Sequence, residues 1–340
     1  GVPISFGLCE IASPGVGGSS ILSIDGKNIK VGPESVGAVP GPASFGRGGK
    51  ESTMTDVNLL MGLLDPKTFF GGGLKLDIDR ALAAIQENIA TPLGISSDEA
   101  LIKLRDAYDT KVAGELSSFA TVSDETVLLA FGGAGPMSAC GIADKSGIKT
   151  VFIPKTAAVF SAYGIGSCDI GQSYAVVLTD FTDGALKAAH ANLVEKAERD
   201  MFAEGYADGD YEVSAQLVGV NGNNETTRVL TDKIVFPKDL SSSDSVTLEF
   251  SARKILRIES SKQAKSSKGE PAKQVAVRSI FGDNQEWSDL PVYDVSKMKS
   301  GNHGVGPAVI EEEYFTCLVR QGWSFVVTEL GDVCLTKGAK

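Results

Sequence analysis

Apolar alternation and helical spacing divide the first part of the chain into recognisable elements. Residues 18–32 alternate on both sides of Asp25-Gly26, which is the pattern of two antiparallel strands joined by a tight turn. Residues 77–89 and 97–117 place apolar side chains at helical spacing and begin with acidic residues, which favour the start of a helix. We therefore expect a hairpin followed by two helices.

A βαβ unit is predicted further along the chain. The apolar run Thr126–Phe131 ends in the glycine turn GGAGP, a helical segment follows, and a second apolar run covers residues 149–153. Because a helix joins the two runs, the strands should be parallel, and we expect a parallel sheet covered by helices. The predicted fold class is α/β.

The pattern changes near residue 175. A long helical pattern covers residues 184–205, and short alternating segments with turn signals such as Asn221-Gly222 follow it. We therefore predict one domain at residues 1–175 and a second at 176–340, made of a helix and a β-rich C-terminal module. Within the second domain, the polar serine- and lysine-rich residues 258–273 are predicted to be a flexible stretch.

Three glycine-rich segments point to a ligand. The first two dozen residues from Val31 hold six glycines and three prolines, which suits an ordered loop that a ligand approaches closely. Gly15–Ser20 and Gly132–Gly135 are two further clusters, and backbone N–H groups in such turns can converge on an anion where no Cβ blocks the approach. Each cluster alone also fits an ordinary turn, but the three together predict a nucleotide cleft.

Charged residues near these segments have two readings each. Arg47 can bind an anionic ligand or form a salt bridge that fixes the loop. Thr53 and Asp56 have the spacing of a capping box before a helix expected at Val57–Leu64, so Asp56 is either a first-turn residue or a residue that faces the cleft. The run Glu311–Glu313 is expected to be a solvated edge or a partner surface.

Composition narrows the function classes. The 340-residue chain carries a net charge of −11, which argues against nucleic acid as a partner, and no apolar run reaches the roughly 18 residues needed to cross a membrane. The five cysteines are far apart and form no CxxC pair, which indicates reduced thiols and a cytoplasmic protein. Neither of the two histidines has metal-ligand spacing, so no site of the zinc type is expected.

Several motifs together resemble the hydantoinase A / oxoprolinase family. Their order and spacing follow the family nearly end to end, and the chain corresponds to roughly the C-terminal half of a typical member. The motifs are GVGGSSI (15–21), VGPESVGAVPGPASFGRGG (31–49), TMTDVNLLMGLLDP (53–66), LLAFGGAGPMSA (128–139), VFSAYGIGSCDI (159–170) and the tail LPVYDVSKMKSG…GVGPAVIEEEYFTCLVRQGW (290–323).

The resemblance implies an actin-like (ribonuclease H-like) ATPase lobe that uses ATP with Mg²⁺ or Mn²⁺. Asp56 would then face the cleft as an Mg²⁺ or phosphate contact, and Arg47 would be a second candidate for a phosphate contact. The implied phosphate loop consists of Gly15, Gly17, Gly18, Ser19 and Ser20, and the implied nucleoside-binding turn of Gly132, Gly133, Ala134 and Gly135.

The chain also departs from the family pattern. The family's other phosphate loop, an Asp-Gly-Gly-Thr-type turn, does not occur before Gly15, so we expect another polypeptide to supply it. Gly17-Gly18-Ser19 is one glycine short of the family's triplet, Ser138 replaces a common histidine, Ala158 replaces a glycine, and ATVSDET (120–126) replaces an Arg-Gly-x-Asp-Pro segment. These departures leave a diverged structural role open.

The family's activities give the expected function. Its members work in multi-subunit assemblies that use ATP to carboxylate ketones or to open cyclic amides. The half-length chain favours a subunit of an acetophenone carboxylase-type ligase, inactive alone, contributing half of an ATP cleft that activates enolate or bicarbonate by phosphorylation. Expected partners are the subunit with the missing phosphate loop and a hydantoinase B-like subunit. The alternatives are part of an ATP-dependent hydantoinase or 5-oxoprolinase, or a non-catalytic scaffold subunit.

Overall fold

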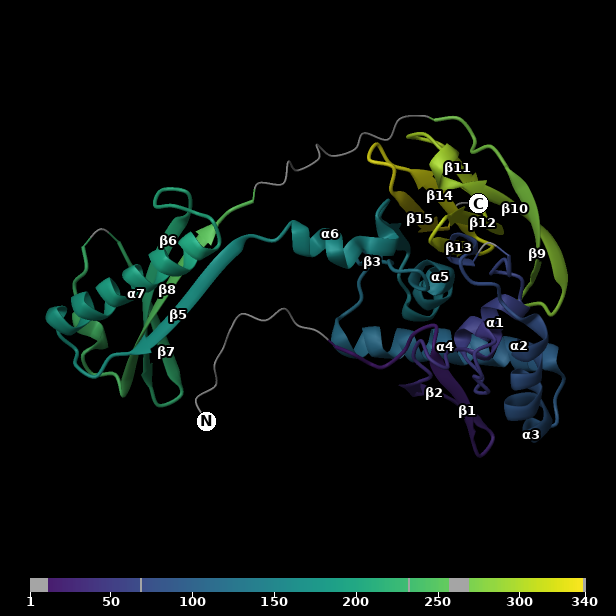
Figure 1. Cartoon of the computed structure of the whole chain (residues 1–340), viewed down its shortest axis with the longest axis horizontal. Helices are drawn as coiled ribbons and strands as arrows, with labels where there is room; N and C mark the ends of the chain where they lie inside the picture. Colours follow the sequence, from purple (N-terminus) through teal and green to yellow (C-terminus); the bar gives the residue numbers. More distant parts are fainter. Residues whose placement is uncertain (1–11, 68, 232, 257–268, 339–340) are drawn as a thin grey trace. The chain divides into compact units, whose positions relative to one another are not determined.

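The computed structural model describes residues 12–67, 69–231, 233–256 and 269–338. They fall into two compact units, each described by itself below (Figure 1). Unit 1 combines Gly1–Phe160 with Lys262–Lys340, and unit 2 is the continuous segment Ser161–Ser261. This division differs from the predicted boundary at residue 175, because the C-terminal strands return to the first unit. Most of the predicted flexible stretch lies outside the described residues.

Unit 1 begins with the predicted hairpin, which is confirmed. Its strands are β1 (Ser20–Asp25) and β2 (Asn28–Ser35), and they pair antiparallel. The turn between them needs Gly26, whose φ of +63° lies in the left-handed region where a Cβ would be strained. Leu22 of β1 is buried beside Ile85 and Leu104, so the hairpin covers one side of the following helices.

The helices of unit 1 start at polar caps. Thr53 precedes α1 (Met54–Leu60), Asp77 precedes α2 (Ile78–Ile85) and Ser96 precedes α4 (Ser97–Phe119), and each side chain accepts a backbone N–H from the first turn. A π-helical turn, η3 (Gln86–Ala90), and the short α3 (Thr91–Leu93) continue the direction of α2. The predicted helices are therefore confirmed, although α1 begins and ends earlier than the predicted span Val57–Leu64.

The predicted βαβ unit is confirmed, but the sheet that contains it is not all parallel. β3 (Val127–Leu129) and β4 (Thr150–Ile153) are parallel neighbours joined by α5 (Gly135–Ser146). The strand order is β11-β14-β15-β4-β3, and the remaining pairs are antiparallel. The added strands are β11 (His303–Val305), β14 (Trp323–Val327) and β15 (Val333–Lys337). The prediction of a parallel sheet is wrong here because a short turn joins β14 to β15, and short turns allow only antiparallel pairing.

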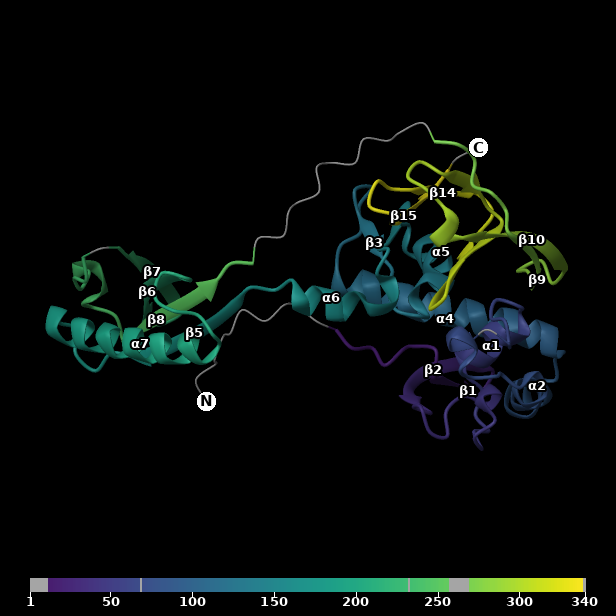
Figure 2. The same ribbon diagram turned by 45° about the horizontal axis from the view of Figure 1, so that its top comes forward.

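A second sheet of unit 1 has the order β13-β12-β10-β9. Its strands are β9 (Ala276–Phe281), β10 (Trp287–Asp294), β12 (Ala308–Glu312) and β13 (Phe315–Val319). Helix α5 packs against β13 and against α4, and Figures 1 and 2 both show it among these elements. Ala139 and Cys140 of α5 are buried in one core with Cys317, Trp323 and Val151. The C-terminal strands are therefore part of the core of unit 1.

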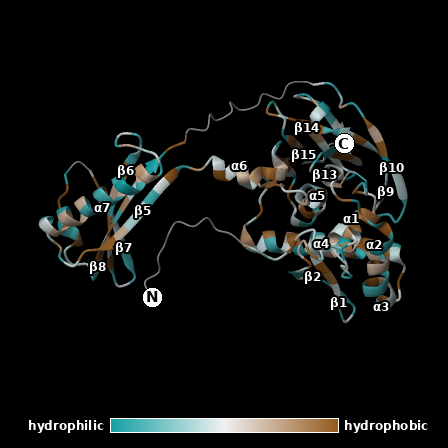
Figure 3. Ribbon diagram, in the orientation of Figure 1, coloured by the Kyte–Doolittle hydropathy of each residue, from teal (hydrophilic) through white to brown (hydrophobic). Residues whose placement is uncertain are grey.

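Unit 2 is a four-stranded antiparallel sheet with a helix on it. The strand order is β5-β8-β6-β7, and the predicted turn at Asn221-Gly222 joins β6 to β7. The elements are β5 (Ile170–Val177), α7 (Asp183–Ala203), β6 (Glu212–Asn221), β7 (Asn224–Leu230) and β8 (Ser245–Lys254), and α6 (Phe160–Gly166) lies where the two units divide. Along α7 hydrophobic and hydrophilic residues alternate (Figure 3), and Leu186 and Met201 on its buried face pack against Phe250 of β8.

Together the two units make a mixed α/β protein, and the actin-like arrangement stays a prediction. Across the described residues, none of the helices combines the length and the apolar character that a membrane span requires.

Candidate functional site

Two of the predicted glycine segments meet at one pocket of unit 1. The pocket has a volume of about 690 Å³, and Gly18, Ser19, Gly133 and Ala134 line it. A Cβ atom placed on Gly18 would lie 3.8 Å from the Cβ atom of Ala134, so the two loops lie close together. Segments far apart in the sequence are thus brought to one site, as the glycine clusters predicted.

The first loop is held in place by Thr55 of α1. The backbone N–H and the hydroxyl group of Thr55 both donate to the carbonyl oxygen of Gly18, each over 2.9 Å. A side chain on Gly18 would approach Thr55 Oγ1 to 3.1 Å, which is tighter than ordinary contact. The glycine at this position is therefore explained by the close approach of loop and helix.

The other predicted residues of the first loop stabilise it through hydrogen bonds within the loop. The buried hydroxyl group of Ser20 accepts the Gly17 N–H over 2.7 Å and donates to the Gly15 carbonyl oxygen over 3.1 Å. These three residues do not line the pocket. Of the predicted phosphate loop, Gly18 and Ser19 are thus the residues that a ligand in the pocket would meet.

The second loop leads from β3 into α5. Gly132 has a φ of +76° and donates its N–H to the carbonyl oxygen of Ala157 over 2.7 Å, while Gly135 begins α5. Gly133 and Ala134 between them face the pocket, and a Cβ atom on Gly133 would lie 3.4 Å from the carbonyl oxygen of Tyr314. A side chain larger than a methyl group at Gly133 would therefore extend into the pocket or against the turn between β12 and β13.

Asp56 is fully buried and does not line the pocket. One carboxylate oxygen accepts the Ser44 N–H over 2.8 Å, and the other accepts the Thr53 N–H over 3.0 Å and the Thr53 hydroxyl group over 2.7 Å. The capping box is thus confirmed. The predicted contact of Asp56 with Mg²⁺ or phosphate stays a prediction.

Arg47 also lies away from the pocket lining. Its side chain is exposed, and its guanidinium carbon is 6.0 Å from the centre of the Phe45 ring. This contact is a cation–π interaction between two residues of the same glycine-rich loop. The role of Arg47 as a phosphate contact stays a prediction.

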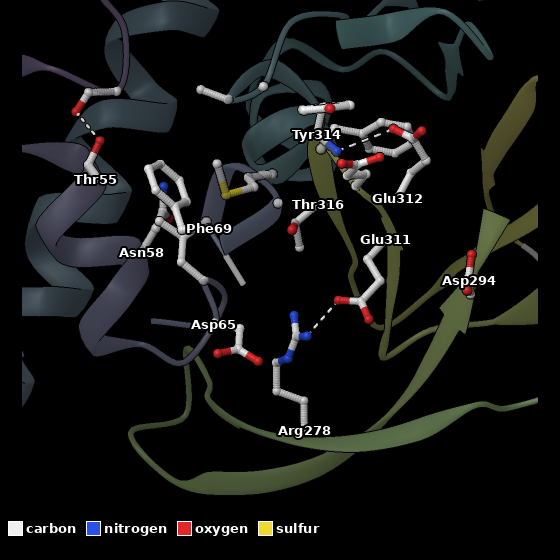
Figure 4. Close-up of a pocket in the computed structure, with 18 of the residues that line it drawn as sticks. Thr55, Asn58, Asp65, Phe69, Arg278, Asp294, Glu311, Glu312, Tyr314 and Thr316 are labelled. Atoms are coloured by element: carbon white, nitrogen blue, oxygen red, sulfur yellow. Dashed lines mark hydrogen bonds and ion pairs between the residues drawn. The ribbon is translucent and has the colours of Figure 1, made fainter. Parts of the chain in front are cut away.

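Asn58 is a pocket residue that the sequence analysis missed. It follows Thr55 by almost one turn of α1, lines the pocket and is only 2% exposed. Its side-chain oxygen is buried and has no hydrogen-bond partner among the described residues. Figure 4 shows Asn58 on the helix side of the pocket, together with Thr55 and Phe69. Thr55 and Asn58 are polar and three positions apart on a helix, so they share one face, and this spacing was a signal that could have identified them.

The opposite margin of the pocket is acidic. Glu311 and Glu312 of β12 line it, together with Glu313 and Asp294, and Asp65 lines the pocket from the segment that follows α1 (Figure 4). The guanidinium group of Arg278 pairs with Glu311 at 2.5 Å and donates to the carbonyl oxygen of Leu63 over 3.3 Å. The glutamate run expected to be a solvated edge or partner surface therefore borders the candidate site.

A buried cluster of charged residues lies next to the helix that follows the second loop. Arg105 of α4 donates to the carbonyl oxygen of Met137 over 3.5 Å, and Met137 is both a pocket residue and part of the first turn of α5. Asp109 lies one turn further along α4, 3.6 Å from Arg320. Burial raises the pKa of Asp109 to about 6, although Arg105 and Arg320 both oppose the shift. The cluster fixes α5 relative to α4.

The Cys140 thiol near the pocket is not suited to nucleophilic attack at neutral pH. Burial raises the pKa of the nearby Cys140 thiol to about 12, so this thiol stays protonated at neutral pH. In the part of the chain that the structure describes, no group of three or more His, Cys, Asp or Glu residues is arranged to hold a metal ion. Two glycine loops and an unpaired buried amide oxygen fit a polar organic ligand such as a nucleotide.

Family models match two parts of the chain. The hydantoinase/oxoprolinase model matches residues 1–174, and the hydantoinase/oxoprolinase C-terminal domain matches residues 252–330. The chain belongs to the hydantoinase/oxoprolinase family. Both loops of the pocket lie within the first match, and its acidic margin at β12 lies within the second.

Individual relatives agree with this family. The chain is 26% identical to the acetophenone carboxylase gamma subunit of Aromatoleum aromaticum, over 93% of this chain and 49% of that subunit. It is 28% identical to the caprolactamase subunit alpha of Pseudomonas jessenii, over 99% of this chain and 53% of that subunit. The chain thus spans about half the length of the curated relatives it matches.

A solved structure of nucleotide-free acetone carboxylase, an enzyme of ATP-dependent acetone carboxylation, has the same fold. Its TM-score against this chain is 0.81 at 24% identity, over 95% of this chain and 52% of that one.

Proposed function

We propose that this family member is a subunit of a multi-subunit, ATP-dependent ketone carboxylase and contributes one side of its nucleotide cleft. The observation that carries the proposal is the meeting of Gly18 and Ser19 with Gly133 and Ala134 at one pocket. Loops of this kind expose backbone N–H groups without interference from side chains, which suits a phosphorylated ligand.

The residues of the pocket fit a nucleotide in three respects. A volume of about 690 Å³ is within the range of small-molecule sites. Gly18 and Gly133 line the pocket without a side chain that would occupy it. Asn58 offers a buried polar atom that lacks a protein partner among the described residues. ATP, when bound, would supply a phosphoryl group to activate an oxygen of the substrate.

The acidic margin implies that a nucleotide site here would need positive charge from other groups. The carboxylates of Glu311, Glu312 and Asp65 oppose a polyphosphate unless cations lie between them. A divalent cation brought with ATP, or basic groups from a partner subunit, would supply the missing positive charge. The second source would make this site a shared one.

An aromatic ketone is the substrate class that we propose first. The acetophenone carboxylase gamma subunit is a relative over 93% of the chain, and it is itself named as one subunit of an assembly. Partner subunits of the hydantoinase B-like type and a source of the missing phosphate loop would complete the enzyme. The proposed setting is cytoplasmic.

Opening of a cyclic amide is the second candidate function. The caprolactamase subunit alpha is 28% identical over 99% of this chain, and caprolactam is a cyclic amide. Both candidates use the same nucleotide pocket, so they differ in what partner subunits present to it. A scaffold subunit is the remaining alternative, and for it the glycine loops would have no ligand to hold.

The test begins with purification of the complex from its source through a tag on this chain. Nucleotide binding and hydrolysis are then measured for the complex and for the single chain. We expect Mg-ATP to be retained by the complex, and no hydrolysis by the single chain. Hydrolysis by the single chain would contradict the shared site. A complex that binds no nucleotide at this chain would favour the scaffold. Carboxylation of acetophenone or hydrolysis of a lactam by the complex distinguishes the two enzyme candidates.

A further inference from the structure

Asn58 leaves a buried hydrogen-bonding atom unused in the wall of the pocket. The residue is 2% exposed, and its Oδ1 atom has no partner among the described residues. Buried polar atoms are normally satisfied by protein, by water or by a ligand, because an unpaired one has lost its hydration without compensation. An unpaired oxygen that lines a pocket is therefore a place where a ligand gains a hydrogen bond.

The walls beside Asn58 are suited to a flat ring. The Phe45 and Phe69 rings both line the pocket, with their centres 6.0 Å apart, and the Met137 side chain lines it as well. Aromatic rings and thioether sulfur pack well against planar groups. A ligand at Asn58 would therefore have an apolar face in addition to a polar edge.

The charge around the pocket argues against a bare anion at Asn58. Five carboxylates line the margin, at Asp65, Asp294 and Glu311–Glu313, and Arg278 is engaged with Glu311. A side-chain amide is neutral, and it offers an oxygen acceptor next to N–H donors. Its natural complement is a neutral group that presents a donor next to an acceptor.

We infer that Asn58 recognises the donor–acceptor edge of a flat ring, either the adenine base of ATP or a cyclic amide. Adenine presents its amino group beside a ring nitrogen, and asparagine pairs with that edge through two hydrogen bonds. A cyclic amide presents an N–H beside a carbonyl group in the same way. The inference rests on the proposed nucleotide function, which it makes specific to one residue.

The experiment compares the wild-type complex with complexes carrying Asn58→Leu or Asn58→Asp. Asn58→Leu keeps the approximate shape and removes both hydrogen bonds, whereas Asn58→Asp keeps the acceptor. Asn224→Leu is the matched control, because Asn224 is exposed on β7 of unit 2. The probes are Mg-ATP, Mg-tripolyphosphate, purine riboside triphosphate, which lacks the amino group, and hydantoin as a cyclic amide. Assembly of each variant is checked by native mass spectrometry.

If Asn58 recognises adenine, Asn58→Leu weakens Mg-ATP binding about 10- to 100-fold and leaves tripolyphosphate binding unchanged. The wild type then prefers ATP over purine riboside triphosphate, Asn58→Asp retains that preference, and Asn58→Leu loses it. If Asn58 recognises a cyclic amide, ATP binding is unchanged and hydantoin binding is lost in Asn58→Leu.

Normal ATP and hydantoin binding in Asn58→Leu would overturn the inference while leaving the proposed function intact. A wild-type complex that binds neither ATP nor hydantoin would overturn both.

Discussion

The side chain and the backbone of Thr55 donate two hydrogen bonds to a single acceptor, the carbonyl oxygen of Gly18, each over 2.9 Å. This relationship joins the start of α1 to the first glycine loop of the pocket. The position of the loop therefore depends on one hydroxyl group as well as on the backbone.

Replacing Thr55 by valine tests this dependence. The variant keeps the volume and the backbone hydrogen bond but loses the hydroxyl donor, so we expect the free energy of unfolding to fall by about 1 kcal/mol. Nucleotide affinity of the complex should fall several-fold, because the loop is less well fixed. Thr55→Ser, which keeps the hydroxyl group, should behave like the wild type. Equal affinities for all three proteins would show that the loop does not need this bond.

A bulky residue at Gly133 should block the pocket. The Cβ atom of Gly133→Val would lie 3.4 Å from the Tyr314 carbonyl oxygen, and its methyl groups would extend into space that a ligand needs. We expect nucleotide affinity of the assembled complex to fall more than about 10-fold, measured by equilibrium dialysis. Gly114→Ala is the control, because nothing lies within 4 Å of a Cβ atom there and alanine favours the helix. Unchanged affinity for Gly133→Val would favour the scaffold.

Asp109 should make stability depend on pH. Burial raises its pKa from 3.8 to about 6, so the folded chain binds more protons than the unfolded chain between these values. Stability therefore falls as pH rises through this window. Between pH 5 and pH 7 the loss relative to Asp109→Asn should be about 1 kcal/mol.

Urea titrations of both proteins at several pH values measure this difference, and groups common to both cancel. A constant difference between the wild type and Asp109→Asn would show that Arg105 and Arg320 keep the Asp109 pKa near its ordinary value.

Trp323 should be essential for the stability of unit 1. It is 1% exposed in the core that contains Val151 and Cys140, and its indole N–H donates to Asp144 over 3.1 Å. Trp323→Ala should lower the free energy of unfolding by about 3–5 kcal/mol. The half-exposed Trp287 gives the matched control, since Trp287→Ala should cost much less in the same denaturation experiment. Similar losses for both variants would contradict the assignment of the C-terminal strands to this core.

Local chemistry explains what the sequence could predict. The capping box of Thr53 and Asp56 and the turn at Asp25-Gly26 depend on residues a few positions apart, so both could be predicted and both are confirmed. The glycine segments were likewise visible, because glycine needs no partner to permit a close approach.

Pairing over long distances explains what the sequence could not predict. The alternation in residues 333–337 indicates a strand, but nothing in it indicates that Leu335 pairs with Val151 of β4. The pocket around Asn58 is completed in the same way by residues from other segments, among them Phe69. A polar residue in an apolar run is ambiguous until its neighbours are known.

The pairing of β15 with β4 also has a consequence for the order in which the protein is made. The ribosome releases β4 long before β15, and all of unit 2 is synthesised between them. Unit 2 is continuous and can fold as soon as its last strand has emerged. The β4 strand, in contrast, keeps one edge open until β15 has been translated, so a nascent chain that stalls before β15 would expose that edge to other proteins.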